Sequence, residues 1–163
     1  MSLIKKILER RSIRRYKQDP IPDNVMKNIL EAGRLAPSAS NRQPWHFIVV
    51  TDKTLKKQLS QGRWNRFIAD SAATIVGCGD PELAPKWYPI DVTIALQNMV
   101  IAAQAQGVGS CWIGDFVEEE VKKLLNIPEK YRIVALLSLG YPAEEPEPRN
   151  KKAFEEIVHY DKF

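Results

Sequence analysis

The chain has 163 residues, of which 44% are hydrophobic and 27% charged, and this size and balance are typical of one globular domain with its own core, here residues 1–163. The net charge of +4 excludes no class of partner. Two isolated cysteines indicate reduced thiols in a cytoplasmic protein. The charged start argues against a signal peptide. The apolar stretch at 92–108 is interrupted by side-chain amides, which excludes a membrane span.

Hydrophobic spacing and turn residues predict the secondary structure in chain order. A short amphipathic helix opens the chain near 3–8, and a second helix, with Asp23 as its N-cap, runs to about Gly33. The remaining elements are a loop at 37–45, a buried strand at 47–51, a helix at 52–61, a buried strand at 73–79, the longest helix at 89–106, a helix at 118–125, a strand at 131–142 and a β-prone end at 156–163. Because helices and strands do not alternate regularly, we expect an α+β fold with helices flanking a central sheet.

The segment ILERRSIRRY, residues 7–16, places four arginines within six positions. In an extended chain Arg10, Ser12 and Arg14 point to one side, and two guanidinium groups flanking a hydroxyl group suit a phosphate. Two alternatives remain open: a solvated charge run at a helix end, which is the commoner meaning of such a motif, and a nucleic-acid-binding patch. The patch is the weaker alternative, because the other basic residues are scattered among acidic ones.

The segment PSASNRQPWHF, residues 37–47, is a loop with two prolines around small polar residues. Its neutral polar side chains are those of Ser38, Ser40, Asn41 and Gln43. Hydroxyl and amide groups of this kind suit the edge of a neutral heteroaromatic ring. We expect Trp45 to anchor the core and His46 to be structural. A metal site is not expected, because His46 and His159 lack thiol or carboxylate partners at ligand spacing.

The segment GVGSCWIGDF, residues 107–116, is rich in glycine and follows a predicted helix. A dinucleotide-binding fingerprint needs a preceding strand, and a P-loop needs a lysine that is absent here. The glycines would let backbone groups approach a flat ligand, with a helix C-cap and turn at Gly107 and Gly109 as the alternative. The chain has no motif for a catalytic nucleophile or acid–base pair, which favours a protein whose cofactor supplies the chemistry.

Four motifs occur in order along the chain: ERRSIRRY at 9–16, PSASNRQPWHF at 37–47, GVGSCWIGDF at 107–116 and LGYPAEEPEPRNKK at 139–152. Together they resemble the nitroreductase family of FMN-dependent oxidoreductases over nearly the whole chain. The resemblance implies an intertwined homodimer with FMN at the interface and an exchanged C-terminal segment. It also implies a ping-pong reaction, in which hydride passes from NADH or NADPH through flavin N5 to an electron acceptor such as a nitroaromatic or a quinone.

The resemblance also implies which residues bind the cofactor. By matching position, the FMN-binding residues are Arg10, Arg11, Ser12, Arg14, Pro37, Ser38, Asn41, Gln43, Ile113, Gly114, Arg149 and Lys151. The first motif would hold the phosphate and ribityl chain, and the last motif would return to the phosphate. The backbone of the glycine-rich motif would meet the flavin edge near N5 and O4. The second motif would reach the same flavin from the other subunit. No side chain is implied as a nucleophile.

The chain is short beside many members of this family, and we expect the region 64–84 to supply the cover over the flavin. The resemblance favours exchange of the segment 156–163 between subunits over an ordinary edge strand. Two alternatives to the NAD(P)H oxidoreductase remain: a flavoprotein of the same fold that fragments flavin or removes halogen reductively, and a non-enzymatic nucleic-acid-binding protein, which ranks lower. With the first function, the partners are a second subunit and a small-molecule acceptor, and neither nucleic acid nor membrane.

Overall fold

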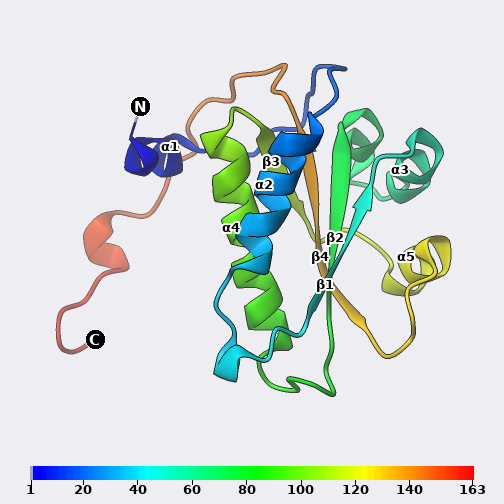
Figure 1. The fold of residues 1–163 in the computed structure, drawn as a ribbon. Helices are drawn as coiled ribbons and strands as arrows, with labels where there is room; N and C mark the ends of the chain where they lie inside the picture. Colours follow the sequence, from blue (N-terminus) through cyan, green and yellow to red (C-terminus); the bar gives the residue numbers. More distant parts are fainter. Residues whose placement is uncertain (1) are drawn as a thin grey trace.

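The computed structural model describes residues 2–163 and contains a four-stranded antiparallel sheet with helices on both faces (Figure 1). The strands are β1 (Trp45–Val50), β2 (Ala73–Gly79), β3 (Gly109–Ile113) and β4 (Arg132–Gly140), in the order β1-β2-β4-β3. The helices are α1 (Leu3–Glu9), α2 (Asp23–Arg34), α3 (Lys53–Leu59), α4 (Tyr88–Ala105) and α5 (Glu118–Leu125), with short 3-10 helices η1 (Ala39–Asn41), η2 (Arg66–Asp70) and η3 (Phe154–Glu156).

Two hydrophobic cores share the sheet. α2 and α4 cover one face, and α3, η2 and α5 cover the other (Figure 1). Because side chains alternate between the faces of a strand, Ile75 and Leu137 pack in the core under α2 and α4, while Val76 and Leu136 pack in the core under α3 and α5. The central strands β2 and β4 are therefore buried on both faces, which explains their nearly continuous apolar sequences.

The expected α+β fold with a flanked central sheet is confirmed, and the predicted ranges 73–79 and 118–125 match β2 and α5. The strand β3 was not predicted, because the glycines of 107–116 were interpreted as places where the backbone approaches a flat ligand, with a helix C-cap and turn as the alternative. Gly107, with φ of +78°, follows the end of α4 as expected. Gly109, however, opens β3, and an added Cβ there would lie 2.7 Å from Ile13 Cγ1. Gly109 therefore serves close packing rather than a turn.

One local prediction is wrong. Asp23 is the first residue of α2 rather than its N-cap, because the extended Pro22 occupies the cap position without a side-chain hydrogen bond. Asp23 can still favour the helix through the positive end of its dipole. The end of the chain, 156–163, contains no strand in the described structure and lies away from the sheet (Figure 1). Within the described chain this β-prone segment pairs with no strand, and its exchange with a second subunit stays a prediction.

No helix found in residues 2–163 has both the length and the apolarity needed to cross a membrane.

Candidate cofactor site

The arginine-rich segment is extended and fixed to the sheet by its buried residues. Ile13 and Tyr16 are buried, and Ile13 N donates to Ser110 O of β3 at 3.0 Å. The Tyr16 hydroxyl donates to Ile13 O at 2.5 Å and shares a 2.7 Å hydrogen bond with Ser138 Oγ. Burial raises the pKa of the Tyr16 phenol, which therefore stays a neutral donor. These inward residues leave the neighbouring arginines on the outer side.

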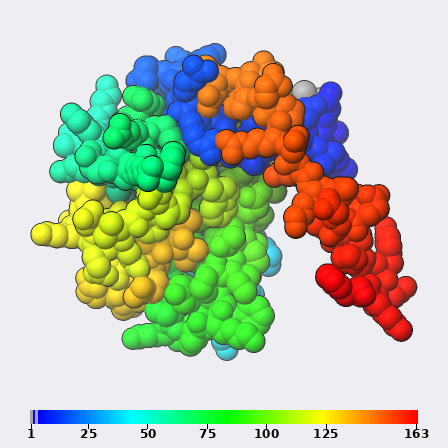
Figure 2. Space-filling view, turned by 180° about the vertical axis from the view of Figure 1, so that it is seen from behind, coloured from blue at the N-terminus to red at the C-terminus, as the bar shows by residue number. Residues whose placement is uncertain are grey.

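The segment after β4 returns along the arginine-rich segment (Figure 2, blue beside orange). Lys17 N donates to Tyr141 O and Ala143 N donates to Arg15 O, both at 2.9 Å. The Glu144 carboxylate accepts from Arg14 N at 2.6 Å, from Arg15 N at 3.0 Å and from Arg15 Nε at 3.1 Å. These hydrogen bonds, led by that of Arg14 N, lower the pKa of Glu144. The charge of Arg15 is thus already paired within the chain.

The other three arginines line a hollow of about 630 Å³ between the two segments, which we call the cationic hollow. Its lining is Ile7, Leu8, Arg10, Arg11, Ser12, Arg14, Pro146, Glu147, Pro148, Arg149 and Lys151. Five cationic side chains face one carboxylate. Arg10 Nη1 is buried and has no hydrogen-bond partner among residues 2–163. Because the positive charges of the lining outnumber the one negative charge, this hollow is suited to an anion.

A second hollow of about 430 Å³, the aromatic hollow, shares Arg14 and Arg149 with the first. The rest of its lining is Trp64, Phe67, Cys111, Trp112, Ile113, Gly114 and Asp115. An added Cβ at Gly114 would meet no heavy atom within 4 Å, so the backbone there is open to a ligand. Burial raises the pKa of the Cys111 thiol, so this cysteine stays neutral and is a poor nucleophile. Cations thus adjoin an aromatic-walled space beside an accessible backbone.

Of the twelve residues singled out in the sequence, eight line these two joined hollows. They are Arg10, Arg11, Ser12, Arg14, Ile113, Gly114, Arg149 and Lys151. Arg11 differs from the expected alternation, since it lines the cationic hollow and also donates to Arg10 O at 3.0 Å.

The other four, Pro37, Ser38, Asn41 and Gln43, lie elsewhere in the chain. Ala39 N donates to the buried Asp91 at 3.1 Å, so this loop adjoins the first turn of α4. The arginine-rich segment follows α1, whose Lys6 Nζ reaches Ala105 O at the last turn of α4. At about 1.5 Å per residue, these ends of α4 are about 21 Å apart. The loop also leads into β1, at the sheet edge opposite β3. Within one chain, the loop 37–43 therefore lies far from the eight residues that line the hollows.

The loop has an unusual backbone that can present its side chains. Ser40, Asn41 and Gln43 have φ of 52°, 53° and 50°, a region that non-glycine residues seldom adopt. Ser38 Oγ accepts from Gln43 N at 2.9 Å and closes the turn. The three residues with positive φ are all exposed. A backbone held in this conformation favours a role in binding over one in packing.

Several further residues lie around the hollows that were not predicted as site residues. They are Trp64, Phe67, Trp112, Asp115 and Glu144. The region 64–84 was expected to provide cover, and its first residues do line the aromatic hollow, whereas Ala84 is buried and packs at the start of α4. Asn65 points into the protein, where its Nδ2 donates to Leu59 O and Asp115 O. No periodic signal marks these positions in the sequence.

The fold and the joined hollows define an α+β protein with an anion-receptive site that opens onto an aromatic-walled space. The family model described as the nitroreductase family matches residues 7–73 and 60–141. The chain belongs to the nitroreductase family.

Individual relatives match over most of their length. A protein of Archaeoglobus fulgidus, provisionally named NADH dehydrogenase/NAD(P)H nitroreductase, is 41% identical over 87% of this chain and 86% of its own. The solved structure of an FMN-dependent nitroreductase from Clostridium difficile R20291 has a TM-score of 0.91 and 31% identity, and covers 98% of this chain and 99% of that chain. The NADPH-flavin oxidoreductase of Vibrio harveyi is 29% identical over 98% of this chain and 74% of its own.

Relatives with other named reactions also match this chain. The iodotyrosine deiodinase of Thermotoga neapolitana is 27% identical over 95% of this chain, and the 5,6-dimethylbenzimidazole synthase of Rhodospirillum rubrum is 25% identical over 83%. Family membership alone therefore does not specify the reaction.

Proposed function

We propose that residues 1–163 form a single domain that binds FMN and acts as an oxidoreductase, taking electrons from NADH or NADPH and passing them to a small-molecule acceptor. The observation that carries this proposal is the pair of joined hollows, one cationic and one aromatic-walled, that share Arg14 and Arg149. Two relatives support it: the Clostridium difficile protein is named an FMN-dependent nitroreductase, and the Vibrio harveyi protein is named an NADPH-flavin oxidoreductase.

The cationic hollow suits the phosphate of FMN. Arg10 has a buried nitrogen without a partner in the described chain, and Ser12, with a neutral hydroxyl group, lines the same hollow. A phosphate carries nearly two negative charges, so it offsets the mutual repulsion of the surrounding cations. Glu144 neutralises Arg15 and holds the backbone of Arg14, and this contact orients the segment toward the hollow. These residues bind and orient, and none needs to exchange a proton.

The aromatic hollow suits the flavin ring, with the backbone of Ile113 and Gly114 at its edge. When bound, FMN would supply the redox chemistry, accepting a hydride from the nicotinamide and reducing the acceptor in a ping-pong sequence. Backbone donors at the ring edge would favour the more negatively charged reduced form. The chain's own contribution is therefore to bind the cofactor, to orient it and to set its electrostatic surroundings.

We also propose a homodimer in which a second copy supplies the loop 37–43. The ends of α4 separate this loop from the cationic hollow within one chain, so only a second chain can bring both sets to one cofactor. The exposed apolar side chains of Ile4, Leu8 and Ile90, on α1 and α4, favour such an interface.

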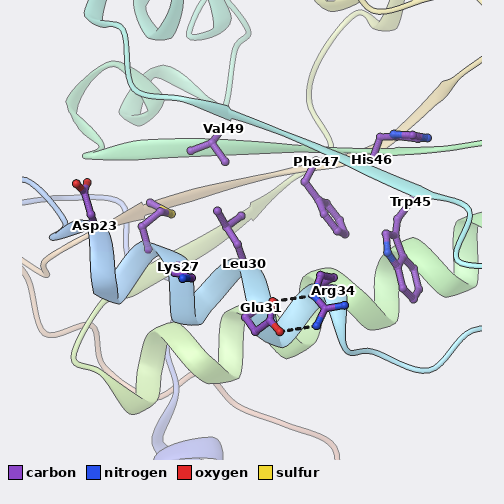
Figure 3. A pocket seen from close by; sticks show the side chains of 10 residues that line it. Asp23, Lys27, Leu30, Glu31, Arg34, Trp45, His46, Phe47 and Val49 are labelled. Atoms are coloured by element: carbon purple, nitrogen blue, oxygen red, sulfur yellow. Dashed lines mark hydrogen bonds and ion pairs between the residues drawn. The ribbon is translucent and has the colours of Figure 1, made fainter.

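In the proposed dimer, the C-terminal tail of one copy binds to the sheet edge formed by β1 of the other copy. A groove of about 550 Å³ lies between α2 and β1, with Leu30, Trp45 and Phe47 pointing into it (Figure 3). Within the described residues, β1 pairs with β2 alone, so its outer edge is free. The tail exposes the apolar side chains of Phe154, Ile157, Tyr160 and Phe163. In the proposed dimer, the tail of a second copy pairs with β1 and buries these side chains.

Steady-state kinetics of the FMN-loaded protein tests the proposed reaction. We expect oxidation of NADH or NADPH to depend on the acceptor, with parallel double-reciprocal lines when both concentrations are varied. Protein that binds FMN but is reduced by neither NADH nor NADPH would contradict the oxidoreductase. That result would favour the dehalogenating or flavin-fragmenting alternative. The deiodinase and synthase among the relatives support that alternative.

A further inference from the structure

Trp64 is an exposed tryptophan on the wall of the aromatic hollow. It lies between α3 and η2, its exposed fraction is 70%, and it lines the hollow together with Phe67 and Trp112. The Arg63 guanidinium lies 4.9 Å from its ring centroid. An exposed indole leaves a large apolar area in water. A flat ligand stacked on it would bury that area and gain an aromatic interaction as well.

The segment that carries Trp64 is fastened to the residue that follows Gly114. Trp64 N donates to Asp115 Oδ2 at 2.7 Å, and Asn65 Nδ2 donates to Asp115 O at 2.8 Å and to Leu59 O at 3.1 Å. Asn65 is buried, and an added Cβ at Gly62 would lie 2.7 Å from its Nδ2. The backbone that carries the indole is therefore held in place, and Trp64 and Gly114 line the same hollow.

The carboxylate of Asp115 lines the hollow but is already used. Its Oδ2 accepts from the Trp64 backbone, and the aromatic rings, Arg14, Arg149 and the open backbone of Gly114 line the rest of the hollow. A segment whose backbone is already fixed loses less conformational entropy on binding than a mobile segment would. The arrangement is one in which a carboxylate holds an aromatic surface next to the proposed flavin edge.

We propose that Trp64 is the stacking surface for a flat aromatic electron acceptor and that Asp115 is the positioning residue that holds it there. This inference rests on the proposed function, because the acceptor must reach a flavin ring beside Gly114. Trp64 determines which acceptors bind well: flat aromatic ones gain from the indole, and acceptors without a ring do not.

A half-reaction experiment tests Trp64 without involving NADH or NADPH. FMN-loaded protein is reduced with dithionite and mixed anaerobically, in a stopped-flow instrument, with menadione or with ferricyanide. Menadione is a flat aromatic quinone, whereas ferricyanide is an octahedral complex that cannot stack. The readout is the ratio of the two bimolecular rate constants. A stacking contribution of ~1 kcal/mol corresponds to about a fivefold fall in this ratio for Trp64→Ala.

Matched variants separate stacking from folding. Trp64→Phe keeps a ring and should retain most of the ratio, whereas Trp64→Leu keeps an apolar side chain without a ring and should lower it as Trp64→Ala does. Asp115→Ala should lower the ratio in the same way, because the Trp64 backbone loses its partner. Asp115→Asn keeps an acceptor oxygen and should restore the ratio. Far-ultraviolet circular dichroism and the affinity for FMN identify variants that fail to fold or to load.

Two results would overturn the inference. An unchanged ratio in both Trp64→Ala and Trp64→Leu would show that no acceptor stacks on the indole. A large loss of FMN affinity in Trp64→Ala with an unchanged ratio in the loaded protein would make Trp64 a cofactor contact instead. Failure of the proposed function is distinguishable, because a protein that NADH and NADPH cannot reduce can still be reduced with dithionite and still give the ratio.

Discussion

Replacing Arg10 and Arg14 together by alanine should weaken FMN binding by at least about a hundredfold. Arg10 brings a buried nitrogen that has no partner in residues 2–163, and Arg14 lies where the two hollows meet. Each charged hydrogen bond contributes at least ~1.5 kcal/mol, so two lost bonds give ~3 kcal/mol, or about two orders of magnitude in the dissociation constant. The assay is quenching of FMN fluorescence as apoprotein is added.

Arg15 offers a matched control within the same segment. Its guanidinium pairs with Glu144 and does not line the cationic hollow. Arg15→Ala should therefore change the FMN dissociation constant by less than about threefold, since exposed ion pairs contribute little. Wild-type affinity in the double variant, or equal losses in the double variant and in Arg15→Ala, would refute the assignment of the phosphate to this hollow. Retained secondary structure by circular dichroism excludes a trivial loss of fold.

Three further predictions address the scaffold and the dimer. Deleting residues 153–163 should give a monomer without flavin by light scattering and absorption, because the α2–β1 groove loses its proposed occupant; a stable yellow dimer would contradict the exchange. Gly140→Ala should lower the free energy of unfolding by about 1–3 kcal/mol in urea, because the new Cβ would lie 2.7 Å from Tyr16 Cδ1; an unchanged midpoint would mean that the segment shifts freely. The pKa of Glu144 is lowered from its usual 4.5, so its ionised form stabilises the fold above that pH and the contribution is lost as pH falls through the lowered pKa. Glu144→Gln should therefore flatten the acid dependence of unfolding, and an unaltered pH profile would argue against this role.

The sequence predicted the elements whose signals are local. β2 and α5 match their predicted ranges because a continuous apolar run and an amphipathic period need no knowledge of neighbours. β3 could not be recognised, since its five residues follow a glycine turn and their strand conformation depends on pairing with β4. The tail shows the converse: its sequence favours a strand, yet it pairs with no strand of the described chain.

In the candidate site, too, local features were predictable from the sequence and contacts across the fold were not. The arginine spacing predicted a phosphate receptor, but not that Arg15 would be paired with Glu144, which lies 129 residues away in sequence. Trp64 and Asp115 have no sequence signal in common, because their contact is a backbone hydrogen bond across the fold. The roles of the twelve proposed cofactor residues, including the loop 37–43 of a second copy, remain predictions for the experiments above.

The visible absorption spectrum of the freshly purified protein, taken before and after anaerobic addition of NADH or NADPH, tests the central claim most directly. We predict a flavin spectrum that bleaches when one of the nucleotides is added. A flavin spectrum that persists with both nucleotides would contradict the proposed reaction while leaving the cofactor site in place. A colourless protein that also fails to bind added FMN would contradict the cofactor site itself, and the unpaired nitrogen of Arg10 would then need a different anion.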